Sequence, residues 1–405
     1  MKRLYAVLSH YVNASLVGAT TKVCMVTACY PPSKGGVERS VEELAKQLRD
    51  RGHRVYVITS SRGLDPTRFY QEVREGVEVA RYPETRFFFD CPINPRIALH
   101  LLNISYDILH VHGVTPTISD FALILGKLKR KPVILTYHYS PVPDYGGRCG
   151  RFISTFYVKV VDRLMVKLSD RIVTATKSFA IGNPNLRDAI KKLSVIPWGV
   201  WLPSPHLMLN DRKAQSSFHV LFVGQLKKYK GIRYLLDAAK ILERKNFSLD
   251  VVVVGDGPEK RALEAYAKSL GVDAEFTGAL TESQLHDCYA NSDVLVLPSI
   301  SGREGFGIVI LEAMSYGKPV IVSDILGPKE IVKDALNGIL VAPKKAYDIA
   351  KAIETLIADP KLLKSLGVNA RNTAEKYSWS KVGDRYEEVY RQAIEKPIFN
   401  QPGEA

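Results

Sequence analysis

The chain has 405 residues, 46% hydrophobic and 24% charged, so it is long enough for two domains with large cores and is not a disordered protein. Its net charge of +14 lies almost wholly in residues 1–200, which carry 29 Lys and Arg against 16 Asp and Glu. No apolar run approaches the roughly twenty residues of a membrane span, and five cysteines without a C-x2-C pair exclude an obvious zinc or disulfide framework and fit a reducing cytosol.

The uneven charge predicts that one domain meets an anionic partner, such as a membrane surface or a phosphorylated lipid. A basic face that only improves solubility is an equally good interpretation. The charge forms no recognisable nucleic-acid motif, so we expect no nucleic-acid partner. Residues 1–21 have the basic start of a secretion signal, but polar residues interrupt the apolar part, and we interpret them as a dispensable N-terminal extension.

A first strand is predicted over 23–29, and a helix over 37–51 ends at Gly52. The loop between them carries Gly35 and Gly36 just before the helix, where the backbone can approach a phosphate or a sugar closely. Taken alone, this pair also fits a simple turn.

Alternating strands and helices then predict a doubly wound parallel sheet. The strands are expected at 54–59, 76–82, 108–112, 133–137, 171–175 and 193–196, with helices near 95–103, 115–130 and 152–169. His110, His112 and His138 come at the carboxyl ends of two strands, and strand alternation places His110 and His112 on one face. A lone histidine there is more often a satisfied core residue, whereas three at one edge favour a ligand site.

Residues 81–99 place three consecutive phenylalanines among Arg81, Arg86 and Arg96. This stretch predicts a surface that dips into an anionic bilayer, together with the basic residues Lys127, Lys129, Arg130, Lys131, Arg148 and Arg151. Packing of the phenylalanines in the core is an equally good interpretation.

A Pro-rich, polar segment over 198–217 is typical of a linker, and a second series of strands and helices follows it. After the strand that starts at His219, Lys230 precedes Gly231 at the start of a helix. A lysine in that place is suited to neutralising a phosphate, although lysine is also common in exposed loops.

Residues 293–324 spell strand, glycine-rich loop, helix and strand, a βαβ unit. The glycines Gly305 and Gly307 open onto a helix N-terminus, which favours an anion such as phosphate. Glu304 comes just before this helix. We expect the helix to be buried because it is apolar on nearly every side, and Glu312 is its only charged residue. Each glutamate alone fits a structural role, but the pair beside the glycines favours a site.

The stretch from Glu304 to Glu312 resembles the E-x7-E motif of the retaining glycosyltransferases of family 4. Three other stretches are similar to family motifs: P-x-x-G-G-V-E at Gly35 and Gly36, G-x-G-P at Gly255, and G-R-L-x-x-x-K-G at Lys230, where Gln225 replaces the arginine. Trp198 and Trp201 stand where the family usually has Asn and Asp. The resemblance spans residues 22–395.

This resemblance implies an α/β protein of GT-B architecture, with two Rossmann-like doubly wound parallel-sheet domains facing a central cleft. The expected parts are an acceptor-binding domain over 22–197, a linker over 198–217, a nucleotide-sugar-binding domain over 218–376, a C-terminal helix over 377–396 that crosses back to the first domain, and a tail over 397–405.

The implied activity is a hexosyltransferase that moves a sugar from a UDP- or GDP-linked donor to a lipid-linked or glycan acceptor, with retention, in glycolipid or surface polysaccharide synthesis. The implied catalytic residues are Glu304, His112 and Lys230, and the donor-binding residues are Gly35, Gly36, Gln225, Gly305, Phe306, Gly307 and Glu312. We expect no cofactor and no obligate metal, because the chain lacks a D-x-D pair. A cytoplasmic enzyme, peripheral on the inner face of the membrane, fits this function.

Two other classes share parts of this pattern. A GT-B nucleotide-sugar epimerase or a phosphorylase has the same architecture, and the phosphorylase needs a lysine that binds pyridoxal phosphate. A non-enzymic nucleotide-binding protein explains the glycine loops and the basic half, although no complete G-x-G-x-x-G and no P-loop occurs.

Overall fold

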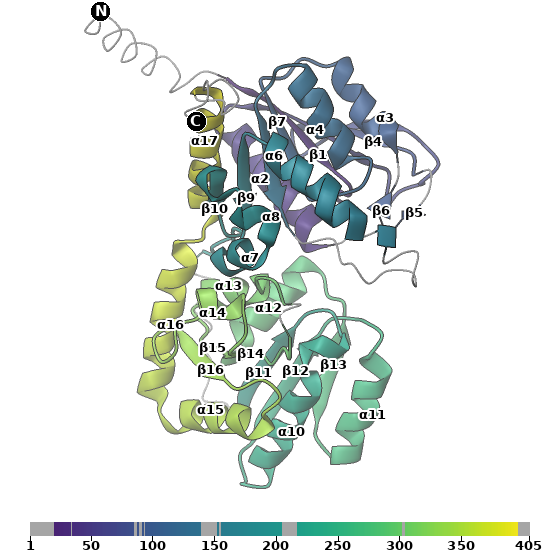
Figure 1. Ribbon diagram of the computed structural model, residues 1–405. Helices are drawn as coiled ribbons and strands as arrows, with labels where there is room; N and C mark the ends of the chain where they lie inside the picture. The colour runs from purple at the N-terminus through teal and green to yellow at the C-terminus, as the bar shows by residue number, and fades with distance from the viewer. Residues whose placement is uncertain are drawn as a thin grey trace, which may run out of the picture. The chain divides into compact units, whose positions relative to one another are not determined.

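The structure is a computed structural model, shown in Figure 1, and it describes residues 20–33, 35–84, 87–88, 91–92, 94–138, 152–153, 155–204, 217–301 and 304–395. The chain divides into two compact units: the first comprises residues up to Ile196 and from Val382 onward, and the second comprises Pro197–Lys381. Three parts of the sequence discussed above lie outside the described residues: residues 1–19 of the N-terminal extension, residues 205–216 of the expected linker, and the side chains of the phenylalanines at 87–89.

The first unit contains an eight-stranded sheet in the order β10-β9-β8-β7-β1-β2-β4-β3. Every neighbouring pair is parallel except β3 and β4, which form an antiparallel hairpin at the edge. The strands are β1 (Lys22–Thr27), β2 (Arg54–Ser60), β3 (Tyr70–Arg74), β4 (Val77–Tyr82), β7 (Ile108–His112), β8 (Val133–Tyr137), β9 (Arg171–Thr174) and β10 (Leu193–Val195). A separate two-stranded sheet pairs β5 (Phe87–Phe88) with β6 (Cys91–Pro92).

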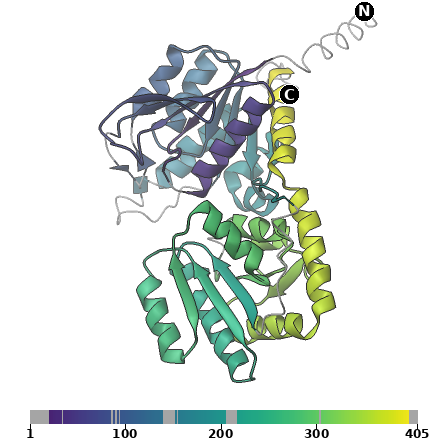
Figure 2. The same ribbon diagram turned by 180° about the vertical axis from the view of Figure 1, so that it is seen from behind.

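Helices cover both faces of this sheet. On the face seen in Figure 1 lie α3 (Pro95–Leu99), α4 (Ser119–Leu128) and α6 (Arg163–Leu168), while α2 (Gly36–Asp50) lies in front of the sheet in Figure 2. The shorter helical segments are η1 (His100–Leu102), the π-helix η2 (Tyr157–Asp162), α7 (Lys177–Gly182), α8 (Pro184–Arg187) and η3 (Ile190–Lys192). Gly126 lets α4 approach the sheet, because a Cβ there would lie 2.5 Å from the Leu109 side chain.

The second unit contains a six-stranded, wholly parallel sheet in the order β13-β12-β11-β14-β15-β16. Its strands are β11 (Phe218–Val223), β12 (Leu249–Val254), β13 (Ala274–Gly278), β14 (Val294–Leu297), β15 (Val320–Ser323) and β16 (Gly338–Val341). Strands β14 and β15 are buried along their whole length, as expected for short apolar runs covered on both faces.

The helical segments of the second unit from η4 to α14 lie between these parallel strands, as βαβ crossovers require, and α15 and α16 follow the last strand. They are η4 (Lys228–Lys230), α10 (Ile232–Glu243), α11 (Lys260–Leu270), α12 (Glu282–Asn291), α13 (Ile308–Ser315), α14 (Pro328–Ile331), α15 (Ala346–Ala358) and α16 (Pro360–Glu375). The carboxyl ends of β11 and β14, which are neighbours in the sheet, lead into the two loops that carry Lys230 and Glu304.

The last helix, α17 (Trp379–Glu395), begins in the second unit and joins the first. Its first residue, Trp379, packs against Gly199, where a Cβ would lie 2.4 Å from the indole ring. Further along, Tyr386 and Tyr390 are buried against His110 of the first sheet. Among the described residues, no helix combines the length and the apolar character needed to cross a bilayer.

Candidate active site

A buried ion pair joins the two loops at the carboxyl ends of β11 and β14. The ammonium of Lys230 donates to Glu304 Oε2 at 2.6 Å, and the hydroxyl of Ser299 donates to the same oxygen at 2.9 Å. Only 7% of Lys230 and 7% of Glu304 is exposed, and Ser299 is fully buried. The two residues are 74 positions apart in sequence, so the pair exists only because the strands are neighbours.

Close contact of the two loops brings this pair together. Gly231 has φ 68° and follows Lys230, and a Cβ on it would lie 2.1 Å from the Pro298 carbonyl oxygen. Only glycine fits there, because the position needs both a left-handed backbone and no side chain. The Ile300 amide also donates to the Tyr229 carbonyl at 2.8 Å, which ties one loop to the other.

The glycine loop after Glu304 leads directly into α13. Gly307 caps this helix with φ 78°, and Gly305 packs so closely on Gly327 that a Cβ on Gly327 would lie 2.5 Å from the Gly305 carbonyl oxygen. Phe306, which lies between Gly305 and Gly307 in the sequence, is only 7% exposed, and its ring centroid is 6.4 Å from that of Tyr377. No side chain caps α13, and its N-terminus favours an anion.

Glu312 is partly buried, whereas the apolar character of its helix led us to expect full burial. Its Oε2 accepts a hydrogen bond from the Tyr289 hydroxyl at 2.6 Å. The Tyr289 ring stacks on Tyr316 with centroids 5.7 Å apart, which fixes the hydroxyl. The hydrogen bond from Tyr289 therefore orients the Glu312 carboxylate.

Gln225, which stands where the family motif has an arginine, is exposed after β11. Lys227, two residues further on, is exposed as well. The neighbouring glycines pack backbone on backbone: a Cβ on Gly255 would lie 2.0 Å from the Gly224 carbonyl oxygen. The turn that carries Gln225 is thus fixed, and its side chain is free to meet a ligand from solvent.

Three histidines gather at the carboxyl ends of β7 and β8 in the first unit. The rings of His110 and His112 lie 3.9 Å apart, which confirms that both point to the same face. Hydrogen bonds of 2.7 Å join His110 to Tyr390 of α17 and to Thr136 of β8. His112 Nδ1 lies 3.4 Å from His138 Nε2, while His112 Nε2 is buried without a hydrogen-bond partner among the described residues.

All three rings are neutral near pH 7, because their surroundings disfavour the charged form. Burial lowers the pKa of His110 to about 3, with the nearby His138 adding to the effect. Burial likewise lowers the pKa of His138 to about 4, and burial together with the other two histidines holds the pKa of His112 well below its usual value. A neutral imidazole can donate or accept one hydrogen bond at its free nitrogen.

Gly35 and Gly36 stand at the start of α2, on the first unit. Gly35 is the residue before the helix and has an extended backbone, φ 175°, and no side chain caps the helix. Nothing in the described residues groups three or more His, Cys, Asp or Glu side chains in a way that could hold a metal ion.

The prediction of a basic, membrane-facing surface is wrong for three of its residues. Arg81 is fully buried and pairs with Glu72 at 2.7 Å, so it cannot reach a bilayer. Lys127 pairs with the buried Asp170 at 2.7 Å, and Lys129 donates to the carbonyls of Leu101 and Ile104 at 2.7 and 2.8 Å. These cations satisfy internal acceptors. Arg86, Arg148 and Arg151 lie outside the described residues.

Comparison with known proteins now decides the family. The profile described as Glycosyltransferase Family 4 matches residues 34–201, and the profile of group 1 glycosyl transferases matches residues 210–373. A glycosyltransferase of Methanocaldococcus jannaschii, itself uncharacterized, is 30% identical over 92% of this chain and 99% of its own length. The chain belongs to glycosyltransferase family 4. It is therefore an enzyme of the hexosyltransferase class, EC 2.4.

Other relatives of this glycosyltransferase carry more specific names. A sulfoquinovosyl transferase of Arabidopsis thaliana is 29% identical over 85% of this chain and 68% of its own length. A phosphatidyl-myo-inositol mannosyltransferase of Mycobacterium leprae is 26% identical over 88% of this chain and 92% of its own length.

Solved structures confirm the GT-B fold of the glycosyltransferase. The HepE protein of Anabaena, crystallised with UDP, superposes with a TM-score of 0.72 at 20% identity and covers 92% of this chain and 100% of its own. The sucrose-phosphate synthase of Thermosynechococcus elongatus gives 0.71 at 22% identity, over 93% and 99%.

Several residues of the site were not predicted from the sequence of this glycosyltransferase. Ser299 could have been found, because it lies two residues after the end of the buried strand β14, in front of the glycine loop. Tyr289, Tyr386 and Tyr390 carry no local signal, since each belongs to an amphipathic helix in which a buried tyrosine is ordinary.

Proposed function

We propose that this glycosyltransferase moves a hexose from a UDP- or GDP-linked donor to a lipid-linked or glycan acceptor, with retention at the anomeric carbon. The observation that carries the proposal is the buried pair of Lys230 and Glu304 beside the uncapped N-terminus of α13. A cation and an anion, both held out of water at the end of a parallel sheet, match the phosphate and hydroxyl groups of a nucleotide sugar.

The second unit would hold the donor. Lys230 and the amides of Gly305–Gly307 would bind the diphosphate, whose developing charge they stabilise as it departs. Glu304 would accept hydrogen bonds from sugar hydroxyls, and Glu312, oriented by Tyr289, would accept from the ribose hydroxyls. With Gln225 in place of the usual arginine, the exposed Lys227 is a second cation for the diphosphate.

The first unit would supply His112, Gly35 and Gly36. The Nε2 of His112, which has no hydrogen-bond partner among the residues that the structure describes, would make one hydrogen bond to the transferred sugar or to the acceptor. Because the ring is neutral, it offers this bond without placing a positive charge beside an oxocarbenium-like sugar. We propose no protein nucleophile and no obligate metal; attack would come from the same face as the leaving diphosphate.

The choice of donor base and acceptor class is supported by relatives. The Anabaena HepE protein has been crystallised with UDP and with UDP-glucose, which supports a uridine nucleotide. The mycobacterial mannosyltransferase is named for a phosphatidylinositol, which supports a lipid acceptor. A lipid acceptor calls for a membrane-facing surface and a peripheral enzyme on the inner face of the membrane.

A helical segment of the first unit offers such a surface. Along residues 152–164, Phe152, Phe156, Val160 and Leu164 recur every fourth position, and their exposed fractions run from 48% to 74%. Lys159 and Arg163 are exposed on the same segment, and the exposed Lys167 follows it in α6. Apolar side chains flanked by cations fit an anionic bilayer, which buries the former and attracts the latter.

Liposome sedimentation tests this surface. Replacing Phe152 and Phe156 by serine should reduce the fraction bound to anionic vesicles at low salt, and the wild type should not bind zwitterionic vesicles. Val73→Ser is the matched control, because Val73 is 72% exposed on the edge strand β3, outside this segment. If the wild type, the phenylalanine variant and Val73→Ser bound equally, or if none of them bound, this segment would not be a membrane-binding surface.

The glycosyl transfer itself is tested with Glu304→Ala and the isosteric Glu304→Gln. Both should abolish transfer to an acceptor while affinity for the free nucleoside diphosphate stays within a few-fold. A non-enzymic nucleotide-binding protein would show no transfer in the wild type and little effect of either variant. An epimerase would convert the nucleotide sugar without any acceptor, which product analysis detects.

A further inference from the structure

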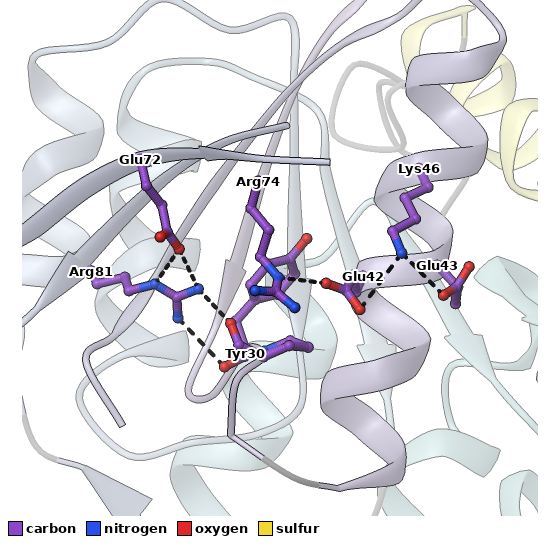
Figure 3. A network of polar contacts seen from close by, with 8 residues as sticks. Tyr30, Glu42, Glu43, Lys46, Glu72, Arg74 and Arg81 are labelled. Carbon is purple, nitrogen blue, oxygen red and sulfur yellow. Dashed lines mark hydrogen bonds and ion pairs between the residues drawn. The ribbon is translucent and has the colours of Figure 1, made fainter. Parts of the chain in front are cut away.

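A fully buried arginine contacts the loop between β1 and α2. Arg81 of β4 is the largest side chain that the described part of the chain buries completely. Its guanidinium donates to the Tyr30 carbonyl at 3.5 Å and, by a shorter bond, to the Pro31 carbonyl. Figure 3 shows the guanidinium beside Tyr30, whose ring centroid lies 5.6 Å from the guanidinium carbon.

Glu72 of the edge strand fixes the orientation of this guanidinium. Both Arg81 Nε and one Nη donate to Glu72 Oε1, at 2.8 and 2.7 Å. Burying a cation is costly unless an anion and hydrogen-bond acceptors replace water, and here a carboxylate and two carbonyls do so. The guanidinium therefore bridges the edge strand and the loop.

The same edge strand also holds the helix on the far side of the glycine turn. Arg74 lies two residues after Glu72 and so points to the same face of β3. Its Nε donates to Glu42 Oε1 of α2 at 2.7 Å, and this bond raises the pKa of the arginine. As Figure 3 shows, Glu42 in turn contacts Lys46, at 3.8 Å. One face of β3 thus reaches both the loop before the turn and the helix after it.

The loop has one further support on its way to Gly35. The Ser33 amide donates to the Tyr30 carbonyl at 3.2 Å, the same oxygen that Arg81 contacts. Gly63, with φ 90°, packs against this turn so closely that a Cβ on it would lie 2.7 Å from the Ser33 nitrogen. The carbonyls of Tyr30 and Pro31 and the amide of Ser33 are therefore fixed two to five residues before Gly35.

We propose that Arg81 is a positioning residue, which with Glu72 and Arg74 of β3 fixes the backbone of the Gly35–Gly36 turn for substrate. The inference rests on the proposed function, in which this turn contacts donor or acceptor. Neither Arg81 nor β3 touches substrate in this account. They act by holding backbone groups where a misplacement of about 1 Å can cost up to roughly 100-fold in rate.

The chemistry of the guanidinium decides which variants are informative. Its rigid fork binds a carboxylate and two carbonyls at once, whereas a lysine ammonium on a shorter, flexible stem cannot reach the same three acceptors in one plane. Arg81→Lys keeps the charge and loses the fork, and Arg81→Met loses both. Arg54→Met is the matched control. Arg54 of β2 pairs at 2.9 Å with Glu78, which lies on β4 like Arg81, but Arg54 is exposed.

Two readouts are measured at a temperature at which circular dichroism shows every variant folded. The first is hydrogen–deuterium exchange of peptides that cover residues 28–45, which needs no substrate. The second is kcat and KM for the donor and the acceptor. We expect exchange at 33–36 to accelerate, and kcat/KM to fall by about tenfold or more, in both Arg81 variants but not in Arg54→Met.

Each outcome decides the inference. Unchanged exchange in the Arg81 variants overturns it, and so does faster exchange with wild-type kcat and KM. A uniform loss of stability, with accelerated exchange throughout the first unit and no selective effect at 33–36, also overturns it. A wild type that uses no nucleotide sugar contradicts the proposed function instead, and the exchange rate then still shows whether Arg81 holds the turn.

Discussion

The ammonium of Lys230 lies 2.6 Å from a carboxylate oxygen of Glu304, and both side chains are more than 90% buried. Each charge neutralises the other while Ser299 supplies a further hydrogen bond. In our proposal the two groups contact different parts of one donor, the diphosphate and the sugar. Binding would therefore exchange one well-compensated arrangement for another, so that the site is kept ready at little cost in stability.

This pairing predicts a separation of stability from activity. Lys230→Met leaves the Glu304 carboxylate buried without its cation and should lower the free energy of unfolding by about 3–5 kcal/mol. Adding Glu304→Gln removes the unpaired charge and should restore most of that stability, while transfer activity stays absent in both proteins. Urea unfolding and a transfer assay measure the two quantities. A double variant as unstable as the single one would show that the pair is not electrostatically coupled.

The returning helix α17 offers a second prediction. Tyr390→Phe removes the hydroxyl 2.7 Å from buried His110 Nδ1, and an unsatisfied buried polar group costs about 1–3 kcal/mol. Tyr386→Phe is the control: its hydroxyl lies 3.5 Å from Thr136, a weak contact, and its loss should cost less than about 1 kcal/mol. Urea unfolding compares the two variants, and equal costs would contradict this role for Tyr390.

The histidines predict how stability depends on pH. Their folded pKa values lie below the ordinary value of 6.5: about 3 for His110, about 4 for His138, and well below it for His112. Unfolding therefore takes up protons below pH 6.5. The stabilisation is fully present above that pH and is lost as pH falls toward 4, by about 1.4 kcal/mol per pH unit for each histidine.

Unfolding in urea at pH values between 5 and 8 checks this dependence. His138→Gln should flatten the curve between pH 6.5 and 5 by the share of one histidine. His286→Gln, at a partly exposed histidine of α12 outside this cluster, is the control. Identical curves for the wild type and His138→Gln would mean that His138 titrates normally in the folded protein.

Much of the fold could be predicted, because its parallel strands are short apolar runs and its helices end at glycines such as Gly52 and Gly317. Strand β3 was missed. Its residues Tyr70–Arg74 show no strict alternation of polar and apolar side chains and none of them is buried, and the hairpin turn uses Glu75 with φ 50° before Gly76. A glutamate in a left-handed conformation is not a signal that local propensity provides.

The sequence predicted which residues belong to the candidate site, but not which of them contact one another. Motif resemblance gave Lys230, Glu304 and Glu312, but only the sheet order shows that Lys230 and Glu304 touch. Arg81 illustrates the opposite error. Its position among phenylalanines and arginines suggested a membrane surface, whereas Glu72, nine residues earlier on the unpredicted strand β3, draws it into the interior.

The most direct test of the central claim, that this chain binds a nucleotide sugar without metal, is a thermal-shift screen of the wild type. UDP-, GDP- and ADP-sugars would be compared in the presence of a chelator. One nucleotide class, at a hundred times its Kd, should add roughly 2.7 kcal/mol of stability and raise Tm, and Lys230→Ala should reduce this shift. A wild type whose Tm moves with none of the donors would contradict the claim.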